Sequence, residues 1–96
     1  MEPSYAPPLK PFYVRVYSRL FRITALEPFE EGHRFFVPVD CRDTEGRMES
    51  QAIVELEECQ SREALLKVSM VRDAIRSAYL NSTKGHAPEG FAYQIL

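Results

Sequence analysis

The sequence predicts a small α+β domain: an antiparallel β-meander of about four strands, one C-terminal amphipathic helix packed on one face, and a short final strand. Two patterns predict this fold class. Apolar and polar residues alternate over much of residues 12–56, and apolar residues recur at helical spacing over residues 62–80. With 96 residues, of which 45% are hydrophobic and 27% charged, the chain suits a single folded core.

The N-terminal segment is rich in proline. Residues 1–11 contain Pro3, Pro7, Pro8 and Pro11, each of which fixes φ and lacks an amide donor. We therefore predict that residues 1–11 form a flexible proline-rich arm and that residues 12–96 form a single α+β domain.

Aromatic and β-branched residues dominate residues 12–26, which favours strand over helix. The apolar positions change parity in the middle: they are Val14 and Val16 first, then Phe21, Ile23 and Ala25. The segment is thus predicted to form two strands, or one long strand bent near residues 18–20. Residues 28–33, which include Gly32, are predicted to reverse the chain.

The next predicted hairpin, residues 34–56, turns at Asp43-Thr44-Glu45-Gly46. This sequence suits a four-residue loop built on a type I turn, in which Asp43 accepts amide hydrogen bonds and Gly46 is left-handed. Pairing Arg42 with Arg47 sorts the apolar residues to one face. On the opposite face this register places Phe36 across from Ile53 and Arg34 across from Glu55.

Pro38 lies inside the first strand of this hairpin. Proline cannot donate a ladder hydrogen bond, so its strand is predicted to lie at a sheet edge or to carry a bulge there.

Ser61 is the expected N-cap of a helix that spans residues 62–80. Leu66 and Met70 fall off its main apolar stripe and are predicted to face solvent. Beyond the helix, residues 91–96 are predicted to form a short last strand or an apolar strap.

The sequence contains no catalytic or metal-binding motif. His33 and His86 lie in predicted loops, and Cys41 and Cys59 form no short couplet of the kind that nucleates a zinc site. We predict no metal, no cofactor and no enzymatic activity; a small enzyme using a loop histidine is the third hypothesis. The two cysteines, without an apolar run long enough for a membrane span, favour a cytoplasmic protein with no membrane partner.

Nucleic-acid binding is the second hypothesis. The formal net charge is −2, which disfavours a dedicated duplex binder, but the segment between Pro3 and Leu26 is basic and has no acidic residue. Tyrosine and arginine alternate along one predicted strand face, as in surfaces that stack and neutralise single-stranded nucleic acid. The residues of this hypothesis are Tyr13, Arg15, Tyr17, Arg19 and Arg22.

The leading hypothesis is a small non-catalytic binding protein. A single helix covers one sheet face, so apolar side chains on the opposite face stay available to an unidentified protein partner or, in a homodimer, to a second copy. The predicted interface residues on the sheet are Tyr13, Tyr17, Phe36 and Ile53, with Leu66 and Met70 as a smaller patch on the helix.

Overall fold

The structure, a computed structural model, describes residues 7–83 and 93–96. Its strands are β1 (Phe12–Val16), β2 (Arg19–Ala25), β3 (Phe29–Glu31), β4 (Arg34–Arg42), β5 (Met48–Glu55) and β6 (Gln94–Ile95). A 3₁₀ turn, η1 (Leu56–Cys59), leads to the short helix α1 (Arg62–Leu65) and the main helix α2 (Ser69–Ser82). This order confirms the predicted α+β class.

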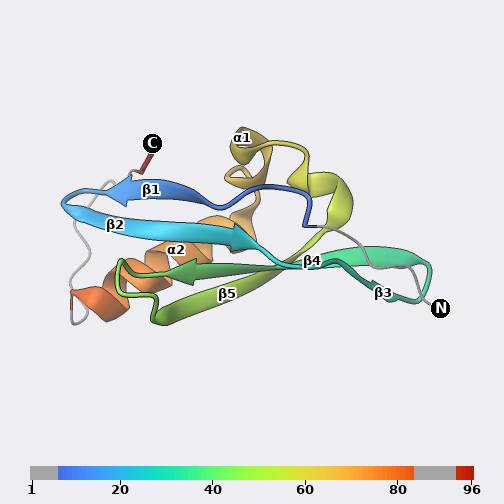
Figure 1. The fold of residues 1–96 in the computed structure, drawn as a ribbon, viewed down its shortest axis with the longest axis horizontal. Helices are drawn as coiled ribbons and strands as arrows, with labels where there is room; N and C mark the ends of the chain where they lie inside the picture. The colour runs from blue at the N-terminus through green and yellow to red at the C-terminus, as the bar shows by residue number, and fades with distance from the viewer. Residues whose placement is uncertain (1–6, 84–92) are drawn as a thin grey trace.

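The six strands form one antiparallel sheet in which β4 is bonded along both edges (Figure 1). One edge of β4 pairs with β5. The other edge pairs with β2 at one end and with β3 at the opposite end, so β2 and β3 follow one another along the same side. Strands β1 and β6 continue the sheet beyond β2. Helix α2 packs against β5 and, less extensively, β4.

The parity change predicted within residues 12–26 arises from a tight turn. Tyr17 and Ser18 connect β1 to β2, Tyr17 has φ 55°, and Val16 pairs with Arg19. A two-residue hairpin turn of this kind needs a positive φ, which accounts for the left-handed tyrosine. The prediction of two strands is therefore confirmed.

Two predicted features of the turn between β4 and β5 are confirmed, the acceptor role of Asp43 and the left-handed Gly46. The Asp43 carboxylate accepts hydrogen bonds from the amides of Glu45 and Arg47, both at 2.9 Å, and Gly46 has φ +86°. At a positive φ glycine has no steric cost.

The predicted register of this hairpin is wrong by two residues. Phe36 lies opposite Glu55, and Ile53 lies opposite Pro38. The Asp43 amide donates to the Arg47 carbonyl, so Asp43 rather than Arg42 lies opposite Arg47, which shifts the register by one residue. A bulge between Cys41 and Arg42 shifts it by a second residue. Because a shift of two restores the same faces, the predicted sorting of inner and outer residues survives from Ser50 to Glu55. Met48, predicted to face inward, lies beyond the bulge, pairs with Arg42 and is 47% exposed.

Pro38 lies where the ladder on one side of β4 is interrupted. Its carbonyl accepts a hydrogen bond of 2.8 Å from the Leu26 amide, in the gap between β2 and β3. The missing proline N–H thus faces this interruption. The predicted edge position is wrong because β4 is paired on both sides, and the bulge of β4 lies between Cys41 and Arg42 rather than at Pro38.

The predicted single helix is divided in two. Ser61 caps α1 as expected, with its hydroxyl accepting from the Ala64 amide at 3.0 Å, but the chain leaves the helix at residues 66–68 and re-enters it at Ser69. At the break, the Tyr93 hydroxyl donates to the Leu66 carbonyl at 2.7 Å, and Leu66 is buried. The prediction that Leu66 faces solvent is therefore wrong, because the break changes the helical phase.

The core lies between the sheet and the helices. Its largest fully buried side chains are Phe21, Ile23, Leu65 and Ile75, and half-buried Leu9 from the proline-rich segment packs against the same cluster. Residues 1–6 of the predicted arm lie outside the described residues. Among those that are described, no helix is long and apolar enough to cross a membrane.

The Asp43 contacts can be tested by substitution. We expect Asp43→Ala to lower the free energy of unfolding by about 1 kcal/mol, because two loop amides lose their acceptor. Thr44→Ala, in the same loop, is the control and is expected to leave stability unchanged. Urea denaturation measures both; equal stability of the two variants would contradict the role of Asp43.

Candidate functional site: the uncovered face of the sheet

The candidate site is the face of the sheet turned away from α2, here called the outer face. In Figure 1 α2 passes behind β2 and β4, so the outer face is turned toward the reader. Cross-strand pairs share a face, and the register therefore defines the members of this one. They include Tyr13, Arg15, Leu20, Arg22, Thr24, Phe29, Phe36, Pro38, Asp40, Arg42, Gln51, Ile53 and Glu55.

One end of the outer face is apolar. Phe29 and Phe36 pair across β3 and β4 with their ring centroids 5.9 Å apart, and Ile53 lies opposite Pro38. Phe29 is 37% exposed and Ile53 44% exposed, while Phe36 and Pro38 are half-buried. These four residues are called the apolar patch below.

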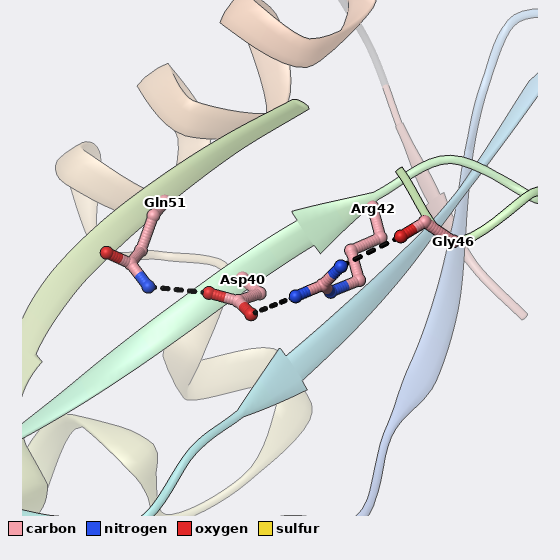
Figure 2. Close-up of polar contacts among 4 residues, drawn as sticks. All are labelled: Asp40, Arg42, Gly46 and Gln51. Carbon is pink, nitrogen blue, oxygen red and sulfur yellow. Dashed lines mark hydrogen bonds and ion pairs between the residues drawn. The ribbon is translucent and has the colours of Figure 1, made fainter. Parts of the chain in front are cut away.

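The centre of the outer face holds a buried carboxylate. Asp40 is only 2% exposed, and it accepts hydrogen bonds from Gln51 at 2.7 Å and from Arg42 at 3.2 Å (Figure 2). Arg42 also donates to the Gly46 carbonyl at 2.8 Å. The network joins β4, β5 and their hairpin loop, and it satisfies a charge that would be costly to bury alone.

The other end of the outer face is basic. Arg22 lies directly across from Arg42 on β4 and from Tyr13 on β1, and Arg15 follows two residues after Tyr13. Arg42 is engaged by Asp40, whereas Arg15 and Arg22 have no carboxylate partner in the part of the chain that the structure describes. Tyr13 is 45% exposed beside them.

The structure brings together only part of the predicted nucleic-acid face. Tyr13, Arg15 and Arg22 share the outer face, but Arg19 pairs with Val16 and thus belongs to the inner parity. Tyr17 occupies the turn and packs on Tyr79 of α2, with ring centroids 5.7 Å apart. The expectation that Tyr13, Arg15, Tyr17 and Arg19 share one face is wrong, because the turn at residues 17–18 interrupts the alternation.

The predicted protein interface is also partly dispersed. Tyr13, Phe36 and Ile53 lie on the outer face, Tyr17 lies at the turn, and Met70 is 54% exposed on α2. Leu66, at 3% exposure, is not available to a partner.

Sequence reasoning missed Phe29, which was placed in a turn. The signal was present: Glu31 and Arg34 flank Gly32 and His33 with opposite charges, as expected for a two-residue hairpin turn. Gly32 has φ +67°, and the strand that precedes it carries Phe29 to the outer face.

His33 lies on an open hollow of about 450 Å³ at the β3–β4 hairpin, beside Arg34 and Glu55, which form a 2.9 Å ion pair. The residues that line it include no serine, threonine or cysteine. His86 lies outside the described residues. The hypothesis of a loop histidine in catalysis therefore gains no converging nucleophile among the described residues.

Both cysteines are buried free thiols. Burial raises the pKa of Cys41 to about 12 and that of Cys59 to about 11, because an apolar environment disfavours the thiolate. Since the thiolate is the nucleophile and the metal ligand, these side chains act as core residues at neutral pH. Among the described residues no group of His, Cys, Asp and Glu is arranged to hold a metal ion.

Comparison of the chain with protein-family models, curated proteins and solved structures found no match. What the outer face can do has to follow from its own chemistry.

The Asp40 network gives a direct test of how this face is held together. We expect Arg42→Ala to lower the free energy of unfolding by about 1–3 kcal/mol, because a buried carboxylate oxygen loses its donor. Arg22→Ala is the matched control on the facing position, and it is expected to be neutral or slightly stabilising because it removes a like-charge neighbour. If thermal unfolding showed equal losses for both, Asp40 would not depend on Arg42.

Proposed function

We propose that the chain is a small non-catalytic binding protein that holds a protein partner on its outer face. The single observation that carries this proposal is the apolar patch on a sheet face that α2 does not cover. Apolar groups at the centre of an interface with polar groups around them are typical of protein–protein contacts.

The proposal depends on the physical support of the patch. Phe36 and Pro38 are half-buried between β3 and β5, so their side chains are held in place by packing. Phe29 and Ile53 are the more exposed members of the patch. Side chains fixed in this way lose little conformational entropy on binding.

The charge of the face indicates the chemistry of the partner. The apolar patch is followed along the outer face by the Asp40 network and then by Arg22 and Arg15, whose charges have no acidic partner among the described residues. A complementary protein surface would place apolar side chains on the patch and carboxylates on the arginines.

The patch is tested by a double substitution, Phe29→Ser with Ile53→Thr. Both side chains are substantially exposed, so we expect the melting temperature to change by only a few degrees and partner capture to fall at least about tenfold. Quantitative mass spectrometry of proteins captured from the native host on the immobilised variants measures this loss.

Met70→Ser is the matched control, because Met70 is 54% exposed on α2 rather than on the outer face. Capture should be unaffected by this change. A partner lost with Met70→Ser and retained with the outer-face variant would assign binding to the helix and contradict the proposal.

Single-stranded nucleic acid is the second candidate, favoured by Tyr13 lying exposed beside Arg15 and Arg22. An aromatic ring next to two cations can stack a base and neutralise phosphates. It is the weaker candidate because Tyr17 and Arg19 do not contribute to the same face.

This candidate predicts salt-dependent binding. Fluorescence anisotropy with a labelled single strand should show affinity at low salt that falls on adding salt, and the Arg15→Ala, Arg22→Ala double variant should abolish it. Absence of binding at low salt removes the candidate.

A further inference from the structure

Strand β5 forms one border of the sheet, and among the described residues it pairs only with β4 (Figure 1). In an antiparallel strand, successive residues direct their N–H and C=O groups to opposite sides. The Pro38 carbonyl is bonded to Leu26, on the side away from β5, so the partner of Pro38, Ile53, does not bond β4. The same alternation turns the backbone groups of Gln51 outward from the sheet.

The outward-facing backbone groups of β5 form a row along the sheet border. At both ends of this row, side chains of the protein form hydrogen bonds with the backbone groups. At one end the Asn81 amide of α2 donates to the Glu49 carbonyl at 3.1 Å. At the other, the Glu55 amide donates to the Glu58 carboxylate at 3.0 Å. Both contacts agree with the outward direction of odd-numbered residues in β5.

Between these closed ends lie the N–H and C=O groups of Gln51 and Ile53, here called the edge window. No hydrogen bond to these groups is formed within residues 7–83 and 93–96. Both residues are exposed. An unpaired row on a sheet border is a template for another strand.

Small side chains of α2 lie on the flank of the helix that reaches this border. Asn81 reaches the β5 border, and Ser77 and Ala74 lie four and seven residues before it, on the same flank of α2. Their side chains are short and uncharged.

We propose that the edge window pairs with the edge window of a second copy of this chain, antiparallel and about a two-fold axis at Ala52, so that the two sheets become continuous. In this register Gln51 of each copy pairs with Ile53 of the other, and every group of both windows is bonded. A longer strand from another protein would run into the closed ends at Glu49 and Glu55. The proposal does not rest on the proposed function, and it places the outer faces of the two copies side by side.

Ile53→Pro tests the pairing, with Ile53→Thr as its matched control. Proline removes the outward N–H without removing a bond to β4, whereas threonine keeps that N–H and shortens the side chain. Sedimentation equilibrium of the full chain should show a dimer that Ile53→Pro weakens at least about tenfold and that Ile53→Thr weakens by no more than about threefold. Circular dichroism checks that both variants fold.

Amide hydrogen exchange on the unmodified chain gives a second measurement, which holds even where proline disturbs folding. The amides of Gln51 and Ile53 should be protected at high protein concentration and lose protection on dilution. A monomer at millimolar concentration with both amides unprotected overturns the proposal. Equal loss of the dimer in both Ile53 variants also overturns it, because the contact would then lie on the side chains of the outer face.

The proposed register of the dimer also brings two like charges together. Glu49 of one copy falls opposite Glu55 of the other, and like charges directly across a ladder are destabilising. Glu49→Gln should therefore tighten the dimer about two- to fivefold. A weaker dimer in this variant would exclude the two-fold axis at Ala52.

Discussion

The backbone of β4, bonded along both of its edges, is the constraint on which the rest of the structure depends. Its alternate residues bond β2 and β3 on one side and β5 on the other. The same alternation sends Val37, Val39 and Cys41 to the helix side and Phe36, Pro38 and Asp40 to the outer face. A change in the strand that a β4 residue bonds would therefore also move its side chain to the other face of the sheet.

One consequence is an imbalance between the two faces of the sheet. The inner face is sealed by α2 and η1, and its valines and Cys41 are almost fully buried. Within the described residues no helix covers the outer face, and Asp40 is its one almost fully buried residue. The Asp40 carboxylate accepts its hydrogen bonds from Arg42 and Gln51. The hydrogen-bonded centre makes the face rigid. The apolar end and the basic end differ in chemistry, so a complementary surface fits the face in one orientation.

A second consequence concerns the β5 border. Since β4 fixes which residues of β5 bond inward, it also fixes which residues point out, and Asn81 and Glu58 then close the ends of that row. Natural sheets commonly protect their borders in such ways. In this protein the backbone groups of Gln51 and Ile53 have no such protection within the described residues.

The sequence by itself determined those features that depend on residues close together in the chain. Period-two alternation sorted most residues of β4 and β5 to the correct faces, the Asp43 and Gly46 turn formed as its chemistry requires, and Ser61 capped a helix. Tertiary structure alone decided the β4–β5 register, the break at Leu66 and the position of Tyr17 against Tyr79. Each of these is set by a bulge, by a bond from residues far along the chain or by packing between elements, and no local pattern encodes such contacts.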